Sequence, residues 1–313
     1  METIETIDVT ILEPRMKHPT IFKKFDEINS GESFIIFNDH DPKPLYYQLV
    51  GERGNIFTWE YLENGPENWL VKIKKNTAEQ NEKSIGEMVA SDYRKAEVFK
   101  KFNIDFCCGG KKTIAQACKN KNIDQTALKS ELDKLDLVPT KASTNYNNWS
   151  VDFMVDYIIN THHSYVKTST PVLLEFLAKV AKVHGDSNPE AISIYNLFVE
   201  IADELSTHME KEENILFPYI KQLADKKINK NDAPFGSIKN PINMMEHEHD
   251  SVGRLFDQIK TLSNNYTPPK GACTTYKVSY LKLEEFENDL HQHIHLENNI
   301  LFPKSIALET ERD

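Results

Sequence analysis

Two segments in the second half of the chain repeat one pattern of histidine and glutamate. The first is His208–Pro218, HMEKEENILFP, and the second is His293–Pro303, HIHLENNILFP. Residues four apart lie on one face of a helix, so each leading histidine faces the same way as the glutamate four residues later. In both copies this face continues as a stripe of apolar residues, which is typical of a helix that faces a core.

A buried histidine beside a buried carboxylate needs an explanation. For a single copy, a hydrogen-bonded core histidine and a glutamate that reaches the surface would be the common interpretation. The internal repeat changes this, because chance would have to place the same polar pair in the same stripe twice. A buried carboxylate is costly unless a cation compensates it. The repeat therefore predicts a metal site that contains His208, Glu212, His293 and Glu297.

Two further segments offer histidines that complete this site. In EHEHD, His249 follows the apolar stripe of its helix. The pair His162-His163 is ambiguous, because each of the two fits an apolar stripe. We favour His163, since nearly equal lengths of chain separate His163 from His208 and His249 from His293.

Four imidazoles and two carboxylates are too many for one tetrahedral zinc ion. Divided between two ions, with each glutamate bridging, they make a symmetric dinuclear centre that leaves room for a bridging oxide and an exogenous ligand. Mixed imidazole and carboxylate donors favour iron or manganese, and carboxylate-bridged metal pairs occur in the cores of helical bundles.

Four long helices must position these ligands. Helical patterns cover residues 150–182, 190–224, 240–263 and 272–307, and loops near Ala233–Gly236 and Thr267–Gly271 separate the later ones. Long helices joined by shorter loops make an antiparallel four-helix bundle, which we assign to residues 149–309.

The chain of 313 residues is long enough for two or three domains. Its 37 basic and 48 acidic residues give a net charge of −11, and the absence of a basic face argues against a nucleic-acid partner. No apolar run is long enough to cross a membrane, and the acidic N-terminus is not a secretory signal. Four cysteines are too few for a disulfide framework. We therefore expect a cytoplasmic protein.

Residues 1–75 predict a two-layer α/β sandwich in the order β-α-β-α-β-β. Its extended runs are Thr6–Leu12, Ser33–Phe37, Phe57–Tyr61 and Trp69–Ile73, and its helical patterns are Ile21–Ile28 and 42–50. The turn NDHDPKP has two interpretations. Its Asn, Asp and Pro residues suit the start of a helix. Alternatively it is a binding loop in which His40 and Asp41 make polar contacts.

A small helical segment, residues 84–138, lies between polar linkers at 74–83 and 138–148. Ser84 and Glu87 predict a capping box at its start. A core of this size is marginal, so we expect the segment to pack on a neighbour or on a second copy of itself.

The centre of this segment is the sequence DFCCGGKK, which contains Cys107 and Cys108. One interpretation is a turn whose cysteines are small buried hydrophobes. The other is a thiol pair whose pKa is lowered by the backbone dipole and by Lys111 and Lys112, able to bind metal or to react with oxidants.

Several stretches resemble known families. NDHDPKPLYYQL and FTWEYLENGPENWLVKI resemble the small DUF2249 domains, whose fold is related to that of TusA-like sulfur carriers, although residues 6–74 contain no cysteine to carry sulfur. DFCCGGKKT resembles the N-terminal domain of ScdA-type proteins. With HMEKEENILFP, EHEHD, TPPKGACTT and HIHLENNILFP, residues 84–308 as a whole are similar to the di-iron repair proteins called RIC, which include YtfE and ScdA and have a hemerythrin-like bundle.

This resemblance implies a function and a cofactor. The family repairs iron–sulfur clusters damaged by nitrosative or oxidative stress, so it implies that this chain supplies iron to damaged iron–sulfur proteins, with Cys107 and Cys108 meeting the client. It implies an oxo-bridged centre of two iron ions with NO or O₂ as small ligands. The implied iron ligands are His163, His208, Glu212, His249, His293 and Glu297.

Alternatives remain open at this point. Oxygen-carrying hemerythrins use five histidines and an aspartate, which argues against oxygen transport here. An enzyme that reduces NO or O₂ at open positions on the irons is one rival, and a sensor that signals through the N-terminal domain is another. Whether the chain forms a homodimer is also open.

Other polar residues of the helical part receive simpler interpretations. His291 and His295 lie two residues from His293 and are expected on the surface. Glu248 either supports the adjacent His249 or is solvated. The remaining cysteines, Cys118 and Cys273, are expected to pack in the interior.

Overall fold

The computed structural model describes residues 4–54, 56–77, 82–136, 145–225 and 235–310. The chain divides between Lys83 and Ser84 into two compact units. Parts of the two expected linkers (78–81 and 138–144) lie outside the described residues, as does Ala233-Pro234 of the expected loop between the helices at 190–224 and 240–263. The expected helical segment and bundle belong to the same unit, so their separation into two domains stays a prediction.

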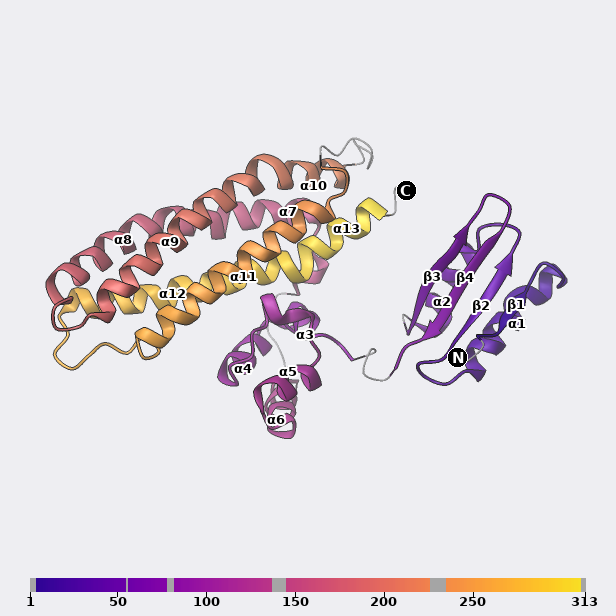
Figure 1. Cartoon of the computed structure of the whole chain (residues 1–313), viewed down its shortest axis with the longest axis horizontal. Helices are drawn as coiled ribbons and strands as arrows, with labels where there is room; N and C mark the ends of the chain where they lie inside the picture. Colours follow the sequence, from indigo (N-terminus) through magenta and orange to yellow (C-terminus); the bar gives the residue numbers. More distant parts are fainter. Residues whose placement is uncertain (1–3, 55, 78–81, 137–144, 226–234, 311–313) are drawn as a thin grey trace. The chain divides into compact units, whose positions relative to one another are not determined.

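The first unit is a four-stranded sheet with two helices (Figure 1). Its elements are β1 (Thr6–Asp8), α1 (Pro14–Glu27), β2 (Ser33–Asn38), α2 (Lys43–Arg53), β3 (Phe57–Asn64) and β4 (Trp69–Lys75). The strand order is β1-β2-β4-β3, with β1 parallel to β2 and the other pairs antiparallel. Alternate residues of β2 and β4, such as Phe34 and Val71, are fully buried in one core with Phe25 of α1 and Leu49 of α2. The predicted two-layer sandwich is confirmed.

Two boundaries of this unit differ from the prediction by more than the others. The first strand ends at Asp8 instead of Leu12, because the Asp8 carboxylate accepts hydrogen bonds from the backbone and hydroxyl of Thr10 and turns the chain. Helix α1 begins at Pro14 instead of Ile21. Its first turns bury no residue before Ile21, so no apolar period marks them in the sequence.

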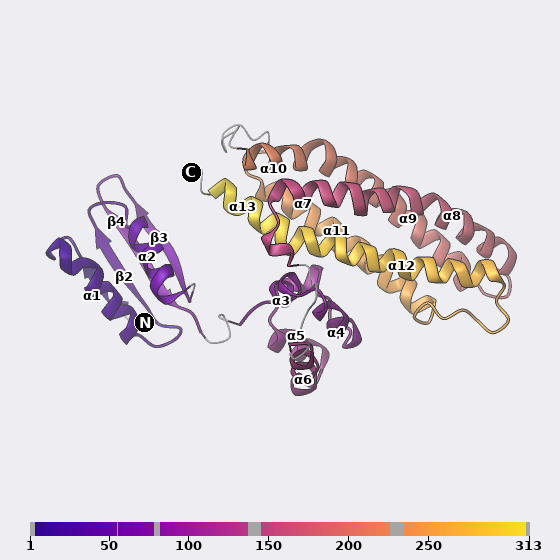
Figure 2. The same cartoon turned by 180° about the vertical axis from the view of Figure 1, so that it is seen from behind.

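The second unit contains a bundle of four long helical stretches that run side by side (Figures 1 and 2). Three of them contain a π turn: α7 (Val151–Tyr157) continues through η4 (Ile158–His163) into α8 (Ser164–His184), α9 (Glu190–Lys211) through η5 (Glu212–Leu216) into α10 (Phe217–Ala224), and α12 (Thr274–Leu296) through η7 (Glu297–Leu301) into α13 (Phe302–Thr310). The remaining stretch is α11 (Lys239–Leu262). The predicted four-helix bundle is confirmed.

A small helical layer packs on this bundle and carries the cysteine pair. It consists of α3 (Ile85–Ser91), α4 (Lys95–Lys101), the 3-10 turn η2 (Cys108–Lys111), α5 (Ile114–Lys121) and α6 (Gln125–Asp136). The predicted capping box of Ser84 and Glu87 starts α3. Phe99 and Phe106 of this layer share one apolar cluster with Leu290 of α12, so the layer does pack on a neighbour, namely the bundle of its own chain.

The side chain of Asn299 holds the two layers together. Its Nδ2 lies 3.2 Å from the carbonyl oxygen of Phe106 and 3.1 Å from that of Cys107. Gly86 and Gly110 leave space for it, because a Cβ atom would lie 2.2 Å from Asn299 Oδ1 at Gly86 and 2.3 Å at Gly110. The contact therefore requires glycine at both positions.

Of the two remaining cysteines, Cys118 is buried as expected, but the expectation for Cys273 is wrong. Cys273 is exposed because it lies just before the first turn of α12, where its sulfur contacts Nε2 of His184 at 3.3 Å. Among the described residues, no helix combines the length and apolar character that a membrane span requires.

Replacing Gly86 with Ala tests the contact between the layers. Alanine normally stabilises a helix relative to glycine. Here the added methyl group must displace Asn299, so we expect the free energy of unfolding to fall by about 1–3 kcal/mol and residues 84–136 to become more sensitive to limited proteolysis. Gly253→Ala in α11 is the matched control, since a Cβ atom there meets nothing within 4 Å. If the two variants behaved alike, the proposed role of Asn299 would be wrong.

Candidate metal centre

The six side chains expected to bind metal lie together in the middle of the bundle. They form two groups, His163 with His293 and His208 with His249, and Glu212 and Glu297 belong to both groups. Within each group, one ligand atom from every residue lies within 4.8 Å of the others. All six side chains are buried.

The two glutamates connect the two halves of the site. Glu212 Oε2 lies 3.4 Å from Nε2 of His163 and 3.3 Å from Nε2 of His208. Glu297 places Oε1 at 3.0 Å from Nε2 of His293 and Oε2 at 3.2 Å from Nε2 of His249. Each carboxylate therefore reaches one histidine of either half, as a bridging ligand of two metal ions must.

π turns shape the chain at the site. Glu212 and Glu297 each begin a π turn, and His163 ends one. Single π turns within α-helices occur often at functional sites, because the additional residue changes the direction of the side chains. Glu213 and Asn298 thereby also face into the bundle, next to the glutamates that precede them.

Three of the four histidines have a hydrogen-bond acceptor behind the ring. The Nδ1–H of His163 donates to Glu213 at 2.7 Å, and that of His208 donates to Glu248 at 2.8 Å. His249 donates to Oδ1 of Asn298 at 2.9 Å. A neutral imidazole with its proton on Nδ1 has its lone pair on Nε2, which is the nitrogen that faces the centre. Metal-binding histidines are commonly oriented by such acceptors.

The fourth histidine, His293, differs from the other three because its neighbour is His162. This difference distinguishes His162 from His163. Glu213 and Asn298 occupy equivalent positions of the repeat. Glu248 and His162 are also equivalent, since Glu248 directly precedes His249 and His162 directly precedes His163. Where Glu248 accepts from His208, His162 instead stacks on His293 with a ring separation of 5.6 Å and donates to Asp289 at 3.0 Å. His162 is therefore buried beside the centre, but it belongs to neither of the two groups of side chains that could hold a metal ion.

The arrangement of polar atoms fits metal ions. The Nε2 atoms of His163 and His293 are 3.2 Å apart, and those of His208 and His249 are 3.0 Å apart. Two nitrogens bound at right angles to one ion, each about 2.1 Å from it, would be about 3.0 Å apart. Both oxygens of Glu212 are buried without a hydrogen-bond partner among the described residues. These inward lone pairs would repel one another unless cations lay between them.

Without metal, only protons can supply the missing positive charge. Burial opposes a charged His208, but the Glu212 carboxylate outweighs this effect and raises the pKa of His208 to about 10. Burial also disfavours a charged Glu297, yet the His293 and His249 imidazoles hold the pKa of that carboxyl well below its usual range. The carboxylates thus stay ionised in a buried site, which is the state that binds cations.

The cysteine turn does not have the electrostatics expected from sequence. Cys107 is 5% exposed, and its thiol donates to Asp105 Oδ1 at 3.1 Å. The neighbouring Cys108 sulfur, burial and the Asp105 charge raise the pKa of the Cys107 thiol well above its usual value. The expected lowering is therefore wrong for Cys107. Lys111 does not approach the thiol, because its ammonium group binds both carboxylate oxygens of Glu246 at 2.7 Å.

The expectation of a surface position for His291 and His295 is also wrong. His295 is fully buried, and His291 is half-buried with its Nδ1 unpartnered among the described residues. Both rings pack on Phe106, because the helical layer covers the face of α12 opposite the metal centre. Burial lowers the pKa of each imidazole to about 4. The two rings are neutral packing groups between thiol turn and bundle.

Sequence reasoning missed Glu213, Asn298 and Asp289, and left the role of Glu248 open. The repeat contained a signal for the first two. Each follows a ligand glutamate at the same position of the repeat and carries an oxygen that accepts hydrogen bonds. Asp289 had no such signal, because only the fold brings it to His162.

Replacing Glu248 with Leu tests whether the acceptors behind the rings matter. Loss of the acceptor frees His208 to turn or to change tautomer, so we expect metal affinity to fall roughly 10- to 100-fold. Glu210→Leu is the control, because it removes the same charge from an exposed position two residues from His208. Competition with a coloured chelator measures both affinities, and equal affinities would show that Glu248 does not orient the ring.

The raised pKa of Cys107 makes a prediction about thiol reactivity. Only the thiolate reacts with iodoacetamide, so at pH 7.5 we expect the half-buried Cys108 and the exposed Cys273 to be alkylated before Cys107. The rate at Cys107 should still be increasing above pH 9, because its pKa lies above that of a free thiol. Peptide mass spectrometry of a pH series measures each rate. Saturation of the Cys107 rate near pH 7 would contradict the expectation.

Comparisons with known proteins extend over both units. Residues 6–75 match the family described as an uncharacterized conserved protein (DUF2249), and residues 81–136 match the ScdA N-terminal domain of unknown function (DUF542). Residues 154–305 match the hemerythrin HHE cation binding domain.

Similar curated proteins match nearly three quarters of the chain. The chain is 38% identical over 229 residues to the iron-sulfur cluster repair protein YtfE of Musicola paradisiaca. The aligned residues cover 73% of this chain and 98% of that protein. It is 39% identical over 227 residues to the protein of the same name from Shigella boydii, with 72% of this chain and 97% of that protein covered. The YtfE protein of an Escherichia coli O81 strain gives the same identity and coverage. The chain therefore belongs to the YtfE family of iron–sulfur cluster repair proteins, and its residues 6–75 also match DUF2249.

Proposed function

We propose that this protein repairs iron–sulfur clusters damaged by nitrosative or oxidative stress, using two iron ions held in its bundle. The observation that supports this most is the sharing of Glu212 and Glu297 between two pairs of inward-facing imidazoles. The names of the relatives supply the repair function, and the family models match the cysteine turn as well as the bundle.

Iron fits the donor set better than zinc does. Each ion would have two imidazoles and a share of two carboxylates, and with bridging carboxylates an ion of higher coordination number keeps positions for other ligands. Structural zinc sites are instead closed by four ligands, commonly with cysteine. When bound, iron supplies a redox-active centre with room for a bridging oxide and for NO or O₂.

The surrounding residues keep the site ready for metal. The acceptors behind the rings fix the imidazoles as neutral ligands, and Lys167 and Lys211 balance the charges of Glu213 and Glu248 at the outer side. Apolar clusters lie on both sides of the centre along the bundle, with Leu205 in one and Leu216 in the other. They exclude bulk water, which strengthens the attraction of the carboxylates for cations.

The thiol turn is our candidate for the contact with a damaged client. Cys108 is half-buried, and Asp105 holds both cysteines on one turn by accepting hydrogen bonds from their backbone N–H groups. Asn299 connects this turn to the π turn that begins with Glu297. In this proposal the iron of the bundle is the material supplied, and Cys107 and Cys108 receive it or hold the client.

A repair assay separates this function from NO reduction. Iron-loaded full-length protein is mixed with a [4Fe–4S] dehydratase inactivated by NO, and both recovered activity and NO consumption are measured. We expect the Cys107→Ser/Cys108→Ser double variant to lose repair while its NO consumption stays unchanged. Cys273→Ser, at an exposed cysteine, should retain both activities.

Other outcomes assign the function differently. Full repair by the double variant would show that the thiols play no part. Rapid NO turnover without any recovery of the dehydratase would favour an NO reductase over a repair factor. We also propose that the protein binds damaged iron–sulfur proteins as clients, takes O₂ as a ligand and forms a homodimer. A pull-down with the same preparation tests the clients, and light scattering tests the homodimer.

A further inference from the structure

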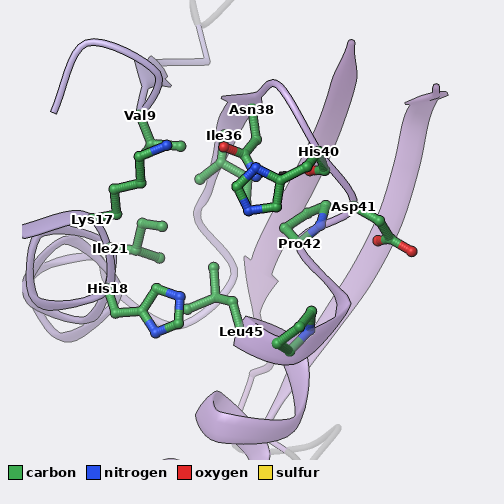
Figure 3. A pocket seen from close by; sticks show the side chains of 11 residues that line it. Val9, Lys17, His18, Ile21, Ile36, Asn38, His40, Asp41, Pro42 and Leu45 are labelled. Atoms are coloured by element: carbon green, nitrogen blue, oxygen red, sulfur yellow. Dashed lines mark hydrogen bonds between the residues drawn. The ribbon is translucent and has the colours of Figure 1, made fainter. Parts of the chain in front are cut away.

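A small pocket in the first unit contains an unpartnered buried amide oxygen. The pocket lies between α1, the end of β2 and the first turn of α2, and its volume is about 50 Å³ (Figure 3). Asn38 at the end of β2 lines it and is 4% exposed. The Oδ1 atom of Asn38 has no hydrogen-bond partner among the described residues. A buried acceptor in this state calls for a donor from water or from a ligand.

The direction of the Asn38 amide is fixed by its other end. Its Nδ2 donates to the carbonyl oxygen of His40 at 2.7 Å. Exchanging the two ends would place Oδ1 against that carbonyl oxygen, where two acceptors would face each other. The atom that remains without a partner is therefore the acceptor, and a ligand in contact with it must donate a hydrogen.

The polar groups around this oxygen favour an anion. Lys17 of α1 lines the pocket, its side chain is 17% exposed, and its nearest carboxylate oxygen, Asp39 Oδ1, is 3.8 Å away, beyond hydrogen-bond distance. Figure 3 shows Lys17, Asn38 and His40 around one end of the pocket and His18 at the other. This contact is an ion pair without a hydrogen bond, so the N–H donors of the Lys17 ammonium group can serve an anion in the pocket.

The only carboxylate among the described residues that line the pocket is turned away from it. The side chain of Asp41 points to the opposite side of its loop (Figure 3), where Oδ1 accepts hydrogen bonds from the Tyr61 hydroxyl at 2.7 Å and from the backbone N–H of Lys43 at 3.0 Å. Asp41 thus accepts a hydrogen bond from the first residue of α2, and the turn starts a helix with Pro44 in its first turn, as one interpretation of NDHDPKP expected. The same turn also forms a wall of the pocket, but the interpretation as a binding loop, with His40 and Asp41 as polar contacts, stays a prediction.

We propose that this pocket binds a small oxyanion that carries one proton, of the size and chemistry of hydrogenphosphate. The anionic oxygens would face Lys17, and the O–H would donate to Asn38 Oδ1. A volume of 50 Å³ holds roughly three to five water-sized groups, which suits an ion of about five non-hydrogen atoms. Sulfate has the same shape but no proton at neutral pH, so it would present an acceptor to an acceptor and be rejected.

Binding can be followed at Asn38 itself in the full-length, iron-loaded protein. Selective ¹⁵N labelling of asparagine makes the side-chain NH₂ signal of Asn38 visible, and Asn38→Leu assigns it. Titration with inorganic phosphate should shift this signal with saturation, and sulfate should need at least tenfold higher concentration for the same shift. Because the signal comes from Asn38, phosphate bound at the metal centre would not be counted.

Variants test the two contacts separately. Lys17→Met should weaken phosphate binding at least tenfold, whereas Lys23→Met, which removes an exposed lysine of the same helix, should change it less than twofold. A phosphomonoester, titrated at about pH 5.5 where it still carries one proton because its second pKa is about 6, distinguishes free phosphate from the phosphate group of a larger ligand. Tighter binding of the ester than of phosphate at that pH would identify the larger ligand as the source.

Three results would overturn the proposal. The first is the absence of a saturable shift at Asn38, which would mean that only water occupies the pocket. The second is equal affinity for sulfate and phosphate. The third is an equal effect of the Lys17 and Lys23 substitutions. Circular dichroism of each variant ensures that lost binding is not lost folding.

Discussion

Two carboxylates in the centre of a helical bundle determine much of this structure. Glu212 and Glu297 are completely buried, and they lie among imidazole nitrogens whose lone pairs also point inward. Such a cluster is stable only when positive charge enters it. Protons can supply that charge, but two metal ions supply it with the observed spacing of donor atoms. The π turns, the acceptors behind the rings and the apolar clusters on either side all serve to hold this cluster in one arrangement.

The bundle is built from a repeat, and its differences from perfect symmetry are informative. Glu213 and Asn298 perform the same task in the two halves, although one is charged and the other is an amide. The position before the central histidine carries Glu248 in one half and His162 in the other, so His293 lacks the acceptor that His208 has. The helical layer with the cysteine turn contacts both α12, which carries His293, and α11, which carries His249. The surroundings of the two proposed metal positions are therefore unequal at His208 and His293.

Much of the fold and of the candidate site could be predicted from the sequence, because the signals were periodic. The apolar stripes predicted the four helices. The repeat predicted four of the side chains that the structure brings together, and the stripes of the other two helices added His249 and His163. The features that were missed depend on contacts between distant residues. Lys111 follows the cysteines in sequence, but it reaches Glu246 on α11 instead of the thiols. His295 looks like a surface residue when α12 is considered alone, and only the packing of Phe106 buries it. The π turns leave no periodic mark that the pattern of apolar residues reveals.

The measurement that tests this account most directly is the metal content of the purified full-length protein, by elemental analysis, beside Glu212→Leu and Glu297→Leu variants. We predict about two irons per chain and almost complete loss of both ions in either variant, since each carboxylate serves both positions. Circular dichroism should show that the helices persist. Zinc in place of iron, or one iron retained after loss of a single glutamate, would contradict a dinuclear centre bridged by these two residues.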